Sequence, residues 1–101
     1  MSSFVYILAS RRKGTLYIGV TTELVKRTSE HKLGIKSVFP KKYHVHQLVY
    51  YEVYEDILTT IAREKTLKKW RRDWKIALIE KDNRWWHDLF PVTAGEGWTA
   101  A

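Results

Sequence analysis

Glu64 is a carboxylate at a position where the sequence pattern predicts a buried, apolar side chain. It lies three residues after Ile61 and three residues before Leu67, so a helix would place it on the apolar stripe. A carboxylate in that position needs a compensating positive charge or a bound metal ion. The alternative is a surface ion pair with Lys68, four residues further along, and in isolation this alternative is the commoner outcome.

Two further pairs of residues could do chemistry on a phosphate. Arg27 and His31 lie four residues apart on one edge of an expected helix, and a guanidinium group binds phosphate oxygens bidentately. Tyr6 and Tyr17 lie in two apolar segments, and a tyrosine acts as a base only if positive charge or metal-bound water offsets its pKa of about 10. The simpler alternatives are a solvated helix with a chance histidine and core tyrosines with hydrogen-bonded hydroxyls.

The net charge of +7 favours a polyanionic partner, with nucleic acid ahead of a membrane surface. The basic residues that could contact nucleic acid are Lys41, Lys42, Lys68, Lys69, Arg71 and Arg72. The same charges could instead form a solvated surface without a specific partner. Trp85 and Trp86 could stack on bases, although burial is the commoner fate of tryptophan. His44 and His46 form a chance pair, because no further ligands stand at the spacing that zinc needs.

Hydrophobic patterns predict a small α+β domain. Strands are expected at Phe4–Ala9, Leu16–Val20 and Gln47–Tyr54, and the first two form an antiparallel hairpin. Helices are expected over residues 23–33, after a cap at Thr21-Thr22, and over residues 57–81, after a cap at Asp56. The second stretch should break between Trp70 and Asp73. The predicted fold is a three-stranded antiparallel sheet flanked by three helices, in the order strand, strand, helix, strand, helix, helix.

Side-chain alternation makes two predictions about the faces of the sheet. Tyr6 and Tyr17 share one face if the loop between their strands holds an even number of residues. In the third strand, strict alternation puts Val49, Tyr51 and Val53 on one face and Leu48, Tyr50 and Tyr54 on the other.

The chain of 101 residues suits one domain, expected over residues 1–90, with a flexible tail over residues 91–101. It contains no cysteine, which excludes disulfides and thiolate metal sites. It also lacks a run of about 20 apolar residues and the charged-then-apolar order of a signal peptide. We therefore expect a cytoplasmic protein without membrane contact.

Several segments, taken in order, resemble the GIY-YIG nuclease family. They are Phe4-Val5-Tyr6, Tyr17-Ile18-Gly19, Thr22-x-Leu24-x-x-Arg27-x-x-x-His31 and Ala62-Arg63-Glu64-Lys65. The ending Asn83-x-Trp85-x-x-Asp88-Leu89 is similar to the Asn-Pro-x-Trp-x-Asp-Leu ending of small stand-alone members. Two positions depart from the family pattern: Phe4 replaces the glycine of the first motif, and Arg84 replaces the proline of the ending.

The resemblance implies a divalent-metal-dependent phosphodiesterase built on a three-stranded antiparallel sheet. Position by position, it implies Glu64 as the protein ligand of Mg²⁺ or Mn²⁺. It implies Arg27 as the group that stabilises charge on the scissile phosphate. Tyr6 or Tyr17 would orient or deprotonate the attacking water, with His31 in a supporting acid–base role.

These implied roles predict a small DNA endonuclease that is structure-selective or weakly sequence-specific, with DNA repair or recombination as a fitting role. Asn83 would complete the polar rim of its site. DNA is favoured over RNA, and specificity would come from substrate shape, a homodimer or a partner protein. Two alternatives stay open. One is a non-catalytic nucleic-acid-binding module of the same fold, and the other is a protein–protein adaptor that docks through Trp85, Trp86 and Trp98.

Overall fold

The computed structural model describes residues 2–33 and 45–90 of the chain. Its strands are β1 (Ser3–Ala9), β2 (Leu16–Thr21) and β3 (Gln47–Tyr54), and its helices are α1 (Leu24–Leu33), α3 (Ile57–Lys69) and α4 (Arg72–Asp82). The strands form one antiparallel sheet in the order β2-β1-β3. The predicted α+β fold and the predicted order of elements are confirmed.

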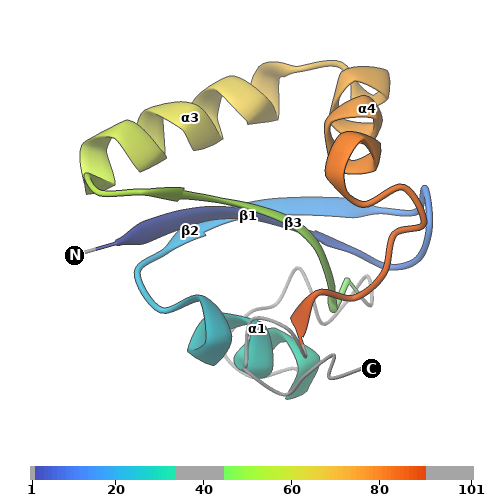
Figure 1. Cartoon of the computed structure of the whole chain (residues 1–101), viewed down its shortest axis with the longest axis horizontal. Helices are drawn as coiled ribbons and strands as arrows, with labels where there is room; N and C mark the ends of the chain where they lie inside the picture. The colour runs from blue at the N-terminus through green and yellow to red at the C-terminus, as the bar shows by residue number, and fades with distance from the viewer. Residues whose placement is uncertain (1, 34–44, 91–101) are drawn as a thin grey trace.

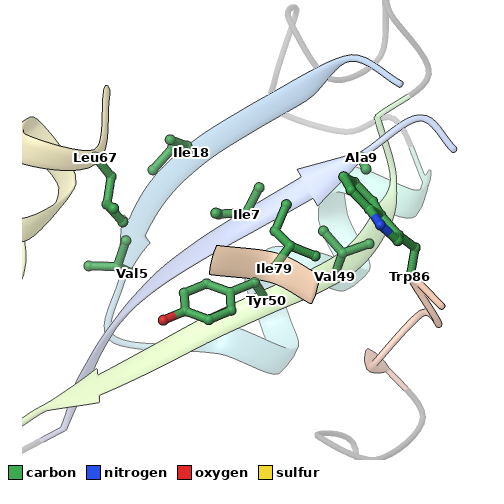
Figure 2. Close-up of a cluster of buried hydrophobic side chains, with 9 residues drawn as sticks. All are labelled: Val5, Ile7, Ala9, Ile18, Val49, Tyr50, Leu67, Ile79 and Trp86. Carbon is green, nitrogen blue, oxygen red and sulfur yellow. The ribbon is translucent and has the colours of Figure 1, made fainter. Parts of the chain in front are cut away.

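The sheet lies between two helical layers. α1 covers one face, and α3 and α4 cover the other (Figure 1). The core cluster on the α1 side consists of Tyr6, Leu8, Leu24, Val45 and Leu48. The cluster on the α3–α4 side consists of Val5, Ile7, Ala9, Ile18, Val49, Tyr50, Leu67, Ile79 and Trp86, shown in Figure 2. The central strand β1 supplies both clusters from alternate residues, as the period of a strand requires.

A β-bulge corrects the predicted faces of β3. Ile7 pairs with Tyr50 and Leu8 pairs with Leu48, so Val49 is the extra residue and has no partner of its own on β1. Val49 and Tyr50 therefore belong to the same core cluster, while Leu48 joins the opposite one. The strict alternation predicted for Leu48, Val49 and Tyr50 is wrong, because the inserted residue shifts the register by one position.

Local hydrogen bonds define the helix boundaries. Asp56 caps α3, since its Oδ2 accepts a hydrogen bond of 2.9 Å from the backbone N–H of Thr59. Trp70 ends α3 with an extended backbone at ψ 150°, and α4 begins at Arg72, so the predicted break is confirmed. Thr21 precedes α1, and its Oγ1 accepts from the N–H of Glu23 at 3.0 Å.

The segment after α4 separates two adjacent tryptophans. Trp86 is buried against the α3–α4 side of the sheet, close to Ala9 and Val49 (Figure 2), and its Nε1 donates to Glu80 at 2.7 Å. Trp85 remains 57% exposed. Counted from Asn83, the tryptophan of the family ending falls on Trp86, so its assignment to Trp85 is corrected.

Several sequence predictions concern residues outside the described ranges. Lys41, Lys42 and His44 lie outside them, as does the tail expected over residues 91–101. No helix within residues 2–33 and 45–90 has both the length and the apolar character that a membrane span requires.

Leu67 provides a test of how α3 packs on the sheet. It is fully buried and points toward Val5 and Ile18 (Figure 2), so Leu67→Ala should lower the free energy of unfolding by about 2–5 kcal/mol. Urea-induced unfolding followed by circular dichroism measures this change. Leu58→Ala is the matched control, because Leu58 lies on the same helix but is 72% exposed. The control should change stability by no more than about 0.5 kcal/mol, and an equally small effect of Leu67→Ala would contradict this packing.

Candidate functional site

Tyr6 lies directly across the backbone of its neighbour on β2. It is 1% exposed and pairs with Gly19 in the β1–β2 register. A Cβ atom at Gly19 would lie 2.5 Å from the Tyr6 hydroxyl oxygen and 2.6 Å from its Cζ, well inside van der Waals contact. Glycine is therefore required at this position for space, and the Tyr6 ring extends over β2, the edge strand of the sheet.

Tyr17 joins Tyr6 on the same face. The loop between β1 and β2 runs from Ser10 to Thr15, an even number of residues, so the condition for a shared face is met. The two ring centroids lie 6.4 Å apart with an interplanar angle of 48°. The paired tyrosines of the sequence thus form one aromatic pair at the β2 side of the sheet.

Charged groups from both helical layers act on the Tyr6 hydroxyl. Burial raises the pKa of Tyr6 well above its usual value of about 10, and the neighbouring Tyr17 adds to this rise. Arg27 of α1 lowers the same pKa, whereas Glu64 of α3 and Glu30 of α1 raise it. α1 and α3 cover opposite faces of the sheet (Figure 1), so the Tyr6 hydroxyl is influenced by a cation from one helical layer and by an anion from the other.

Arg27 borders a polar hollow. Its guanidinium Nε lies 3.6 Å from Glu30 Oε1, and its side chain is 49% exposed while that of Glu30 is 16% exposed. The hollow has a volume of about 310 Å³ and is lined by Thr21, Glu23, Lys26, Arg27 and Glu30. An exposed guanidinium with one loose carboxylate partner can accept phosphate oxygens from solvent. A larger hollow of about 740 Å³, which includes Phe4, Val25 and Val53, is mainly apolar, and Lys26 is the cation in its lining.

Glu64 forms the predicted ion pair with Lys68 and is nevertheless mostly buried, whereas its role as a metal ligand stays a prediction. Its side chain is only 18% exposed, and its Oε2 forms an ion pair of 2.9 Å with Lys68. The ion pair uses one carboxylate oxygen, so the other can accept a further ligand. A single carboxylate fits a hard cation such as Mg²⁺, which takes few protein ligands and keeps several waters. Within the described ranges, no three or more His, Cys, Asp or Glu side chains are grouped to hold a metal ion.

The residue before Glu64 fixes the orientation of α3. Arg63 donates from Nε and Nη2 to the two carboxylate oxygens of Glu52 on β3, at 2.9 and 3.0 Å. Tyr50 and Tyr54 donate their hydroxyls to the same carboxylate. Burial alone would raise the pKa of Glu52, but the hydrogen bonds from Arg63 and the two tyrosines outweigh it and lower that pKa. This network was not predicted from the sequence. Glu52 stands two residues from both Tyr50 and Tyr54, and in a strand this spacing places the three side chains on one face, which was a usable signal.

Other predicted site residues lie apart from Tyr6. Asn83 ends α4, and its Nδ2 donates to the carbonyls of Val49 and His87 at 3.0 and 2.8 Å. Both of its amide hydrogens are thus used to tie the end of α4 to β3, and a place for Asn83 at a polar rim stays a prediction. His31 lies in α1, and its side chain is outside the described part of the structure.

The predicted nucleic-acid contacts have different surroundings. Lys68 pairs with Glu64, whereas Lys69 is exposed at the end of α3. Arg71 lies over the ring of Trp74, with 4.8 Å from its Cζ to the ring centroid. Arg72 donates to the carbonyls of Lys13 and Gly14 in the β1–β2 turn, at 2.5 and 2.7 Å. A role in nucleic-acid binding remains a prediction for all four, and Arg72 in addition anchors the turn.

The sequence model of the GIY-YIG catalytic domain matches residues 2–77. The chain belongs to the GIY-YIG family. UPF0213 proteins of Staphylococcus aureus strains Mu3 and Mu50 are each 32% identical to it over 80 residues, which is 79% of this chain and 96% of theirs. A solution NMR structure of a UPF0213 protein from Bacillus halodurans has a TM-score of 0.55 and 22% identity, covering 92% of this chain and 98% of that one. This likeness shows a shared fold.

Membership of the family relates Tyr6, Tyr17, Arg27 and Glu64, which we call the cluster around Tyr6, to a class of enzymes. Proteins of the GIY-YIG family are generally endonucleases, and family nucleases generally use divalent metals. The match extends from the start of β1 into α4, so it includes the two tyrosines, Arg27 and Glu64.

Because Tyr6 lies so close to Gly19, we predict that replacing this glycine by alanine lowers the free energy of unfolding, the opposite of the usual effect in a strand. Alanine is normally better than glycine in a strand, yet Gly19→Ala should destabilise the protein by about 1–3 kcal/mol because the new methyl group would overlap the ring. Urea-induced unfolding of Gly19→Ala, Tyr6→Leu and the double variant forms a thermodynamic cycle. The destabilisation should shrink when Tyr6 is already replaced, and strict additivity would contradict this contact.

The raised pKa of Tyr6 predicts a loss of stability at alkaline pH. The folded protein holds this proton more tightly than the unfolded chain, so the free energy of unfolding should fall as the pH rises above about 10. Burial raises the pKa of Tyr50 as well, so either Tyr6→Phe or Tyr50→Phe should make the fall less steep. Urea titrations between pH 7 and the alkaline range measure it. A Tyr6→Phe curve parallel to that of the wild type would show that Tyr6 contributes nothing.

Proposed function

We propose that this protein is a divalent-metal-dependent endonuclease that hydrolyses phosphodiester bonds in DNA. The observation that carries the proposal is the surroundings of the buried Tyr6 hydroxyl, which is influenced by Arg27 of α1 and by Glu64 of α3 and whose ring lies beside that of Tyr17. A cation and an anion placed beside phenol groups suit a reaction in which charge develops on phosphate oxygens. Membership of a family of endonucleases supports the same reaction class.

Arg27 is the group we assign to the scissile phosphate. Its exposed guanidinium borders a polar hollow, and its partner Glu30 lies at 3.6 Å, a loose ion pair. A phosphate group can take the place of Glu30, because two parallel N–H donors match two phosphate oxygens. The same positive charge then stabilises the additional negative charge of the transition state.

Glu64 is the group we assign to a divalent metal, Mg²⁺ or Mn²⁺. Its carboxylate is mostly buried yet uses only Oε2 for Lys68, so it can bind a cation without losing all of its charge compensation. When bound there, a divalent cation supplies Lewis-acid stabilisation of the phosphate and of the leaving oxygen. Lys68 would then be released toward solvent, where its side chain is already 53% exposed.

The tyrosines are assigned to the attacking water. Hydrolysis requires the water oxygen to bond to phosphorus while the bond to the leaving oxygen breaks, and the water must lose a proton. Since burial raises its pKa, Tyr6 keeps its proton near neutral pH and is suited to donate a hydrogen bond that orients the water or phosphate. Proton removal then falls to Tyr17 or to His31, the two remaining candidates of the sequence analysis.

Specificity is proposed to come from the shape of the substrate, from a homodimer or from a partner protein. We assign the nuclease unit to residues 1–90, with the remaining residues as an appended tail. DNA is proposed ahead of RNA, and repair or recombination of DNA is the setting that a structure-selective cut would serve.

The test is cleavage of a nucleic-acid panel in the presence of Mg²⁺ or Mn²⁺. The panel contains single strands, blunt duplexes, flaps, junctions and RNA. Glu64→Gln should lower cleavage on the order of 1,000-fold, because several kcal/mol of transition-state stabilisation would be lost. Arg27→Gln should lower it by about 100-fold or more, as removal of one oxyanion donor does in other enzymes.

Glu55→Gln is the matched control for Glu64→Gln, since Glu55 is an exposed carboxylate just before α3. The control should cut like the wild type, and circular dichroism should show that all variants are folded. Metal-independent cleavage, or full activity of Glu64→Gln, would contradict the proposal. A wild-type protein that binds the panel without cutting would favour the non-catalytic binding module.

A further inference from the structure

A positively charged aromatic surface lies at the end of the sheet formed by the β1–β2 turn. The Cζ of Arg12, in this turn, lies 5.5 Å from the centroid of the Trp85 ring, and the Cζ of Arg84 lies 5.1 Å from it. Trp85 is nevertheless 57% exposed, and both arginines are exposed as well. We name these three residues the Trp85 patch.

The fold holds the Trp85 patch in place from two sides. Arg72 binds the carbonyls of Lys13 and Gly14 and so fixes the turn that carries Arg12. On the other side, Asn83 accepts from the N–H of His87 at 2.9 Å and donates back to its carbonyl at 2.8 Å. Trp85 therefore stands on a closed loop with its indole outward, while the next residue is buried.

We propose that the Trp85 patch binds unpaired nucleotides of a DNA substrate, by stacking a base on the indole and by contacts of the two guanidinium groups with the flanking phosphates. Aromatic rings with arginine beside them are how sequence-tolerant single-strand sites are built, because every base has a π-face. Arginine planes also stack on bases, so Arg12 and Arg84 extend the platform instead of blocking it. The net charge of +7 supplies the complementary field for the phosphate backbone.

The patch is separate from the cluster around Tyr6. β1 continues for three residues beyond Tyr6 and ends at Ala9, which is about 10 Å at about 3.3 Å per residue, and the patch lies beyond that end, at the turn. A strand of B-form DNA covers about 10 Å in about three nucleotides. The inference rests on the proposed nuclease function. The preferred substrate for cleavage would place a duplex at Tyr6 and unpaired bases at the Trp85 patch.

The experiment measures binding without cleavage. Fluorescence anisotropy in EDTA at one fixed salt concentration gives the Kd for two labelled DNAs, a blunt duplex and the same duplex with a single-stranded extension. Trp85→Ala should weaken binding of the extended DNA about tenfold, since loss of one stacked base typically costs between about fivefold and 100-fold. It should leave binding of the blunt duplex within about twofold.

Three further variants separate stacking from charge and from general surface effects. Trp85→Phe should retain most of the binding, and Arg12→Lys should bind the extended DNA better than Arg12→Gln while lacking the planar guanidinium. Leu58→Ala is the control for the loss of an exposed apolar side chain, because Leu58 is 72% exposed in the first turn of α3, far from the turn (Figure 1). It should bind both DNAs like the wild type.

Either of two results would overturn the inference: unchanged binding of both DNAs by Trp85→Ala, or an equal loss for both. The first would leave the Trp85 patch to a protein partner, and the second would make it a duplex contact. Cleavage with Mg²⁺ is measured separately on the same DNAs. A wild type that cuts, with no selective loss for Trp85→Ala, refutes this inference alone. A wild type that does not cut but shows the selective loss refutes the nuclease and supports the single-strand site.

Discussion

The contact between the Tyr6 ring and the bare backbone of Gly19 is the constraint on which the candidate site depends. Tyr6 belongs to the central strand and to the core cluster on the α1 side. The missing Cβ at Gly19 lets its ring extend over the edge strand. Its hydroxyl is thereby desolvated and still near groups from both helical layers. Because a desolvated phenol resists ionisation, the proposed mechanism assigns the stabilisation of a reacting phosphate to Arg27 and to a cation at Glu64.

The second requirement is that α3 presents Glu64 on the correct side. Consecutive residues of a helix point about 100° apart, so the direction of Arg63 sets the direction of Glu64. Arg63 is held by two hydrogen bonds to Glu52 on β3, and its guanidinium also lies 5.2 Å from the centroid of the Trp70 ring. The ionic network therefore holds Arg63 toward β3, and Glu64 points about 100° further around the helix. A hydrogen-bonded ion pair of this kind contributes orientation more than net stability.

The sequence was sufficient for the elements, because strand and helix periods differ. It made the shared face of the two tyrosines depend on an even number of loop residues, and the structure supplies that number. It was also sufficient for the helix break at Trp70. The apolar spacing continues through this residue, but residues 57–81 form a stretch that is unusually long for one helix, so a break was expected. It could not give the bulge at Val49, which depends on how two strands pair and not on either strand alone. Nor could it choose between the two readings of Glu64, since partial burial and the Lys68 ion pair coexist in three dimensions. Trp85 and Trp86 were indistinguishable as residue types, and only the turn closed by Asn83 separates them.

The turn that holds Trp85 and Trp86 has a strained backbone. Trp86 has φ 61°, a left-handed conformation that costs a bulky residue about 1–3 kcal/mol. Burial of the Trp86 indole offsets this cost, but it would do so equally well if Trp85 were any polar residue. The strain therefore explains how one tryptophan is buried while its neighbour points outward, where Arg12 and Arg84 lie against its ring. In the proposed scheme this exposed ring serves the substrate, and β1 joins Tyr6 to the turn that carries Arg12 of the Trp85 patch. A fixed distance between a site for the scissile phosphate and a site for unpaired bases would let one small domain select DNA by its shape.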